Sequence, residues 1–129
     1  MKRFGGANGK LLVSVPEYID NMTHIIDAFL QAGAKVIVLT PTPIVEPIVN
    51  TSPACQAVSM TWDNGNLQAC ADALVGIAHK RGIPVVDLVA AFSTQPDPAL
   101  YCPDGLHPGP AGHQIIIEKV LDAVNSYSS

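Results

Sequence analysis

The chain has 129 residues and a mass of 13.6 kDa, which suits one domain and leaves little room for a second. Of these residues 48% are hydrophobic and 14% are charged, so the composition excludes an intrinsically disordered chain. Seven Lys and Arg against eleven Asp and Glu give a net charge of −4, which argues against a nucleic-acid binder. We expect no membrane span, because no apolar run is long enough.

The first predicted helix covers residues 16–32, with Pro16 in its first turn and Gly33 directly after its end. Its apolar residues recur at steps of three and four and predict one buried stripe: Tyr18, Ile19, Met22, Ile25, Ile26, Phe29 and Leu30. The β-branched run 35–39 predicts a strand buried on both faces. Residues 44–62 carry scattered prolines and polar residues and predict a surface excursion that contains at most one helical turn.

A second helix is predicted over 65–80, capped by Asp63 or Asn64. Its predicted stripe consists of Leu67, Cys70, Ala71, Leu74, Ile77 and Ala78. Residues 83–88 predict a second buried strand, and 93–110 a proline-rich loop. The last helix is predicted over 111–124, with five residues facing inward: Ile115, Ile116, Val120, Leu121 and Val124.

This alternation of helices and strands predicts an α/β protein with a small parallel sheet flanked by helices. Residues 1–4 supply at most the tail of a third strand, which is thin for this architecture. We therefore expect residues 1–129 to form a single, partial domain. The three cysteines are too few and too scattered to predict a disulfide framework.

Ligands of parallel α/β sheets bind at the carboxyl ends of the strands. This places three segments at the expected crevice: residues 5–9, residues 40–43 and the loop that leads to Asp104 and His107. Asp104 precedes His107 by three residues with Gly105 between them, so a turn can aim the carboxylate at the imidazole. A carboxylate on one ring nitrogen fixes the tautomer and leaves the other nitrogen free to act as a base. The alternative is a polar turn that caps the last helix.

The segment Asp-Gly-Leu-His-Pro at 104–108, followed by Gly112, His113 and an apolar helix, resembles the last conserved block of SGNH, or GDSL-type, esterases and lipases. Residues 4–9 resemble their Gly-x-Asn-Asp block, and residues 15–43 and 71–88 resemble the isoamyl acetate-hydrolysing branch. The resemblance implies a three-layer, flavodoxin-like fold that hydrolyses small carboxylic esters. We expect no cofactor and no metal.

Carried over by position, the resemblance makes His107 the general base and Asp104 the residue that orients it. Asn8 would donate its side-chain amide to the oxyanion, a donor typically worth about 10²–10³ in rate. The family's Gly-Asp-Ser nucleophile block does not occur in the chain, and Gly9 stands where the family has Asp after Asn. The sequence thus resembles the C-terminal half to two-thirds of such a hydrolase, with its N-terminal part missing.

Other residues were weighed for the missing roles. None of Ser14, Ser52, Ser59 and Ser93 is predicted on a tight strand-to-helix turn, and Cys102, near His107, is better explained as an inert thiol. A zinc site would use Cys102, Asp104, His107 and His113, but all four cluster around one loop without a distant second pair.

The family's sheet order, 2-1-3-4-5, would make residues 1–4 the third strand and leave it as an open edge. Open edges and exposed apolar helix faces attract partners, so we expect the chain to self-associate as a homo-oligomer through this edge. Two alternatives to an active esterase therefore remain: an inactive truncated remnant and a self-associating interaction module. A cytoplasmic location is the default, because residues 1–10 lack the apolar block of a secretory signal.

Overall fold

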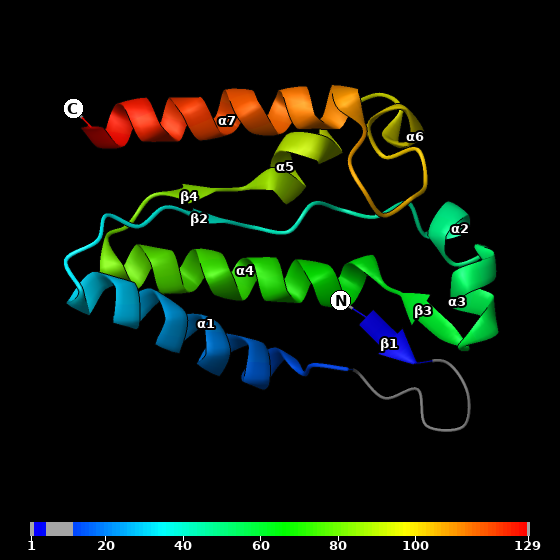
Figure 1. Ribbon diagram of the computed structural model, residues 1–129, viewed down its shortest axis with the longest axis horizontal. Coiled ribbons are helices and arrows are strands. Elements are labelled where there is room, and N and C mark those ends of the chain that lie inside the picture. Colours follow the sequence, from blue (N-terminus) through cyan, green and yellow to red (C-terminus); the bar gives the residue numbers. More distant parts are fainter. Residues whose placement is uncertain (1, 5–11, 129) are drawn as a thin grey trace.

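The computed structural model describes residues 2–4 and 12–128. Its centre is a parallel pair of strands, β2 (Val38–Leu39) and β4 (Val85–Val86). Helices α1 (Val15–Gln31) and α4 (Asn64–Arg81) lie on one side of this pair, and α5 (Leu88–Ser93) and α7 (Pro110–Ser128) lie on the other (Figure 1). The predicted α/β class, with a small parallel sheet among helices, is confirmed.

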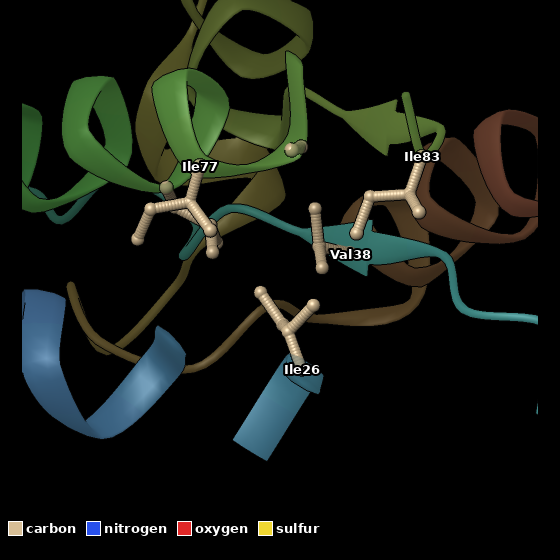
Figure 2. Packing of buried hydrophobic residues seen from close by; sticks show 6 residues of the cluster. Ile26, Val38, Ile77 and Ile83 are labelled. Atoms are coloured by element: carbon tan, nitrogen blue, oxygen red, sulfur yellow. The ribbon is translucent and has the colours of Figure 1, made fainter. Parts of the chain in front are cut away.

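The strands alternate their side chains between the two helical layers, as a pleated sheet requires. Val38 packs in the cluster on the side of α1 and α4, which also contains Ile26 and Ile77. Val86 packs in a second cluster with Phe92 of α5, against Ile115 and Ile116 of α7. Figure 2 shows the first cluster, in which Ile26, Val38, Ile77 and Ile83 converge from four segments of the chain.

Both strands are shorter than the predicted runs 35–39 and 83–88, and the inclusion of Leu88 in a strand was wrong. The strand ends and α5 begins at Leu88, because two side chains accept the first backbone N–H groups of this helix. The buried hydroxyl of Thr40 accepts the backbone N–H groups of Leu88 and Val89 at 2.8 and 3.3 Å. The carboxylate of Asp87 accepts the N–H of Ala90 at 2.9 Å.

Helix α4 follows its sequence prediction closely. Asp63 is its N-cap and accepts the N–H groups of Gly65 and Asn66, and the helix ends before Gly82. All six residues of the predicted stripe are buried: Leu67, Cys70, Ala71, Leu74, Ile77 and Ala78. Arg81 at the end of α4 forms a two-bond ion pair with Asp27 of α1, which fixes the two helices against each other.

The stripes of α1 and α7 are only partly covered. Ile25 and Phe29 of α1 are 49% and 57% exposed, and Leu121 and Val124 of α7 are 54% and 41% exposed. The prediction that these four residues face inward was wrong. Among the described elements, α1 packs mainly on α4, and α7 packs mainly on β4, α5 and α6.

The excursion after β2 is more ordered than predicted. It contains two short helices, α2 (Glu46–Val49) and α3 (Pro53–Ala57), and strand β3 (Met60–Trp62). The proline-rich loop likewise contains α6 (Pro98–Tyr101). Proline suits the first turn of each of these three helices, where its missing N–H costs nothing.

Strand β1 (Lys2–Phe4) pairs antiparallel with β3, with Lys2 opposite Trp62 and Phe4 opposite Met60. The expectation that residues 1–4 form the third strand of the parallel sheet was therefore wrong. The side-chain amide of Asn50 explains why β3 is available: it bonds both the N–H and the C=O of Trp62, at 2.7 and 3.0 Å. These two hydrogen bonds support the extended backbone of β3, with which β1 pairs.

The helices of the described segments do not include one that could cross a membrane.

Candidate acid–base site

The turn at 104–107 brings together two of the predicted site residues. One carboxylate oxygen of Asp104, Oδ1, accepts the N–H groups of Leu106 and His107 at 2.8 and 2.6 Å. The other, Oδ2, lies 2.7 Å from Nδ1 of the His107 ring. The predicted contact between carboxylate and imidazole is thus confirmed, and Nε2 is the ring nitrogen that Asp104 leaves open.

The hydrogen bonds of Asp104 are not those of a residue that caps α7. The two N–H groups that Asp104 accepts belong to Leu106 and His107, which precede α7. The carboxylate therefore organises its own turn and the histidine ring, rather than the first turn of the last helix. The alternative of a polar turn capping α7 does not describe what Asp104 does.

Gly105 makes the turn possible. Its φ is +82°, in the left-handed region that only glycine enters freely, and a Cβ there would lie 2.7 Å from the backbone N of Val49. Its carbonyl accepts the N–H of Val45 at 2.9 Å. The turn is thereby seated on α2 and the segment that follows β2, which is the carboxyl end of the parallel sheet.

Hydrogen bonding dominates the electrostatics of Asp104. The backbone N–H of His107, the His107 ring and the N–H of Leu106, in that order, lower the pKa of its carboxyl to about 2. The side chains of Asp104 and His107 are 56% and 76% exposed, so both face solvent. At neutral pH the carboxylate is ionised and able to stabilise a positive charge on the ring.

The alternative nucleophiles have other surroundings. Cys102 is 3% exposed, and burial, aided by the negative charge of Asp104, raises the pKa of its thiol and keeps it protonated. Ser14 and Ser52 accept N–H groups of the helices they cap, and Ser93 donates to Ala90 within α5. Ser59 lies exposed between α3 and β3. These placements favour structural roles.

Asn8, the predicted oxyanion donor, lies outside the described residues. The zinc alternative finds no support, because within residues 2–4 and 12–128 no three side chains of His, Cys, Asp or Glu gather as a metal site.

Two polar residues outside the turn fix neighbouring segments, and the sequence analysis predicted this role for neither of them. Thr40, at the end of β2, is 2% exposed and positions α5 through the bonds described above. Asn64 bonds both the N–H and the C=O of Ile44, at 3.0 and 2.7 Å, and so fixes the segment beneath Gly105. Thr40 begins one of the segments expected at the crevice, and its position directly after a buried strand was the available signal for its role. Asn64 was predicted only as a possible helix cap.

Two hollows lie near these elements. A cavity of about 200 Å³ lies between the segment after β2, α5 and α6, and Cys102 forms part of its wall. A larger groove of about 690 Å³ runs between α5 and α7 and is lined by Thr94, Glu118 and Lys119 among others. Neither Asp104 nor His107 lines this groove, so we assign it no part in the site.

The layered fold and the aspartate–histidine turn define an SGNH-hydrolase-like domain, and solved structures agree. A lipase/acylhydrolase from Enterococcus faecalis superposes with a TM-score of 0.70 at 16% identity, over 90% of this chain and 54% of that one. LAE5, an alpha/beta hydrolase enzyme from the metagenome of Lake Arreo, superposes with a TM-score of 0.66 at 23% identity, over 91% and 50%. At these identities the likeness shows the fold.

Sequence comparisons then give the family. The rice (Oryza sativa subsp. japonica) GDSL esterase/lipase WDL1 is 31% identical over 112 residues, 84% of this chain and 43% of that protein. The human isoamyl acetate-hydrolyzing esterase 1 homolog is 26% identical over 116 residues, which are 88% of this chain and 47% of that protein. The GDSL-like lipase/acylhydrolase family model matches residues 3–115. The chain belongs to the GDSL-like lipase/acylhydrolase family, and it spans about half the length of these curated relatives.

Proposed function

We propose that the chain carries the acid–base part of a carboxylic ester hydrolase site, with His107 as general base and Asp104 as its positioning residue. The observation that carries the proposal is the 2.7 Å contact between Asp104 Oδ2 and His107 Nδ1, which leaves Nε2 facing solvent on an exposed ring. Family membership supports the reaction class, because relatives in two kingdoms bear esterase names.

In the proposed reaction, Nε2 of His107 takes the proton of an attacking hydroxyl while its oxygen forms a bond to the ester carbonyl carbon. The carbonyl electrons move to oxygen, and the side-chain amide of Asn8 donates to that oxyanion. His107 then returns the proton to the alkoxide as the ester C–O bond breaks. The ionised carboxylate of Asp104 stabilises the imidazolium between these steps. No residue of the chain is assigned as the nucleophile, since the Gly-Asp-Ser block does not occur in it.

The test is hydrolysis of p-nitrophenyl acetate by the wild-type chain and three variants. His107→Ala and Asp104→Asn should each lower the rate, and His107→Ala should lower it more, because it removes the base itself. His113→Ala is the matched control, because His113 is an exposed histidine six positions further along whose loss should leave the rate unchanged. Equal rates for wild type and His107→Ala would remove the base role of His107.

A second candidate function, self-association, is favoured by the uncovered side of α7. Ile117, Leu121 and Val124 are each more than 40% exposed on this helix. In the described chain β2 and β4 pair only with each other, so each has an open edge, and Leu39 of β2 is exposed there, in place of the edge expected at residues 1–4. Light scattering at tens of micromolar should show a homo-oligomer; a monodisperse monomer would count against this function.

A further inference from the structure

The groove between α5 and α7 is bounded by strand β4. Val85, Val86 and Asp87 line it together with residues of the two helices, which lie over β4 in Figure 1. Its volume of about 690 Å³ falls within the range of about 300–1,000 Å³ that is typical of ligand sites. The exposed Leu121 and Val124 of α7 do not line it, so the groove is separate from the apolar side of α7 considered for self-association.

The backbone of β4 leaves polar groups unpaired at this groove. On the side of β2, the N–H of Val38 donates to the carbonyl of Pro84 at 3.1 Å, and the N–H of Thr40 donates to the carbonyl of Val86 at 3.0 Å. Successive residues of a strand direct these groups to alternate sides, so the N–H and C=O of Val85 point away from β2. No described segment pairs with β4 on that side. Val85 therefore offers a donor and an acceptor to a further strand.

The N–H of Asp87 extends this open edge. Asp87 lies two positions after Val85, so its N–H points to the same side. Its carbonyl is already used, because it accepts the N–H of Ala91 in α5 at 3.0 Å. An added strand can thus bond the N–H and C=O of Val85 and the N–H of Asp87.

The charged residues that line the groove are mainly acidic. Asp87, Glu118 and Asp122 supply carboxylates, and Lys119 is the one cation among the lining residues in the described chain. Glu118 and Asp122 lie four positions apart on α7, so they share one face of the helix. Glu118 accepts a hydrogen bond from the neutral amide of Gln114 at 3.0 Å. Positive charge on a guest would therefore be attracted to this face of α7.

We propose that β4 and this groove bind an extended, basic peptide segment, which adds to the open edge of β4 as a further strand. Strand addition supplies backbone hydrogen bonds, and every second side chain of the added strand points to the side of α5 and α7. Lys or Arg at these positions would face the carboxylates of Glu118 and Asp122. A sheet edge alone accepts many extended chains, and the acidic wall selects a basic one.

The first test is a capped peptide of alternating Lys and Val, six residues long, titrated into the wild-type chain. In proton–nitrogen NMR the backbone signals of Val85 and Asp87 should shift and saturate, while that of Ile26 in the cluster of Figure 2 should stay in place. The matched peptide with Glu for Lys should shift none of them, and added salt should weaken the binding of the basic peptide. No saturable shift up to about 1 mM peptide would overturn the proposal.

Strand addition itself is tested by two isomers of the basic peptide. One is N-methylated at every Val and the other at every Lys. In an extended strand the N–H groups of alternate residues point to opposite edges, so only one isomer loses the N–H groups that face β4. One isomer should therefore lose binding and the other should keep it. Equal affinities of the two isomers would overturn strand addition.

The acidic wall is tested by a matched pair of charge reversals on exposed helix positions. Asp122 lines the groove and Asp72 of α4 does not, and both are exposed. Asp122→Lys should weaken binding of the basic peptide by about threefold to tenfold, and Asp72→Lys should leave it nearly unchanged. Equal losses would overturn the assignment of the wall. Shifts at Val85 and Asp87 that grow with protein concentration, without peptide, would assign the edge to a second copy of the chain and overturn the basic peptide as its occupant.

Discussion

The turn at 104–107 and the outer side of α7 lie close together in sequence. The polar groups of the turn have partners within the described chain, whereas the apolar residues on the outer side of α7 are exposed. The bonds within the turn are local, because Asp104 accepts two N–H groups of the turn and contacts the His107 ring. The described chain also supplies its support, since Gly105 fits where a Cβ would collide with the backbone of Val49. The outer side of α7 leaves Leu121 and Val124 exposed to solvent.

This difference shows that a polar contact can form between residues close in sequence, whereas an apolar helix face needs cover from residues far away in sequence. A carboxylate can position a histidine within four residues, because both groups and the bonds between them are local. An apolar helix face is covered only by elements distant in sequence, and in the described residues Leu121 and Val124 of α7 stay exposed. The chain covers about half of its curated relatives, and the contact between Asp104 and His107 is nonetheless formed within it.

The largest predicted effect contrasts two helices through the same substitution. Leu74 of α4 is 0% exposed and Leu121 of α7 is 54% exposed. Leu74→Ala should lower the free energy of unfolding by about 2–5 kcal/mol, since it opens a cavity in the first cluster. Leu121→Ala should change it by no more than about 0.5 kcal/mol. Urea denaturation of both variants is the measurement; equal losses would show that α7 is covered.

Gly105→Ala should cost about 2 kcal/mol or more, because it combines a left-handed backbone with a collision against the backbone of Val49. Gly76→Ala in α4 is the control, since a Cβ there meets nothing within 4 Å and alanine favours the helix by about 0.5–1 kcal/mol. Urea denaturation should therefore show a lower free energy of unfolding for Gly105→Ala and a higher one for Gly76→Ala. A neutral Gly105→Ala would mean that the turn is not rigidly seated.

The carboxyl of Asp104 should titrate in the folded chain near pH 2, below its ordinary value of 3.8. Because the folded pKa is the lower one, the stability this carboxylate contributes is present above about pH 4 and lost as the pH falls toward 2. Side-chain carbonyl NMR of Asp104 gives the midpoint. The free energies of unfolding of the wild type and of Asp104→Asn, measured at about pH 4 and at lower pH, give the contribution of this carboxylate to stability. A titration midpoint at 3.8 would contradict the hydrogen-bonded turn.

The smallest effect is expected at the surface ion pair between α1 and α4. The hydrogen bond from Arg81 lowers the pKa of Asp27, and the two groups lie 2.5 and 2.9 Å apart at their two contacts. Asp27→Asn should lower the melting temperature slightly, and high salt should shrink the difference from wild type. A salt-independent loss comparable to that of Leu74→Ala would contradict this interpretation.

The sequence predicted what depends on local pattern. The stripe of α4, the parallel pair and the contact between Asp104 and His107 follow from periodicity, β-branching and a three-residue spacing. It did not predict that residues 2–4 pair with β3, because that pairing joins two segments far apart in the sequence. The bonds from Asn50 to Trp62 of β3 also come from twelve positions away. The exposed residues of α7 were mispredicted for the same reason, since periodicity marks an apolar side without saying what covers it.

The proposed function requires that Asp104 hold the His107 ring with Nε2 open, and the tautomer of the neutral ring reports this arrangement. Long-range proton–nitrogen NMR of the wild-type chain should show Nδ1 protonated toward Asp104 and Nε2 bare. In Asp104→Asn this preference should weaken or reverse. A neutral His107 protonated at Nε2 in the wild type would contradict the account.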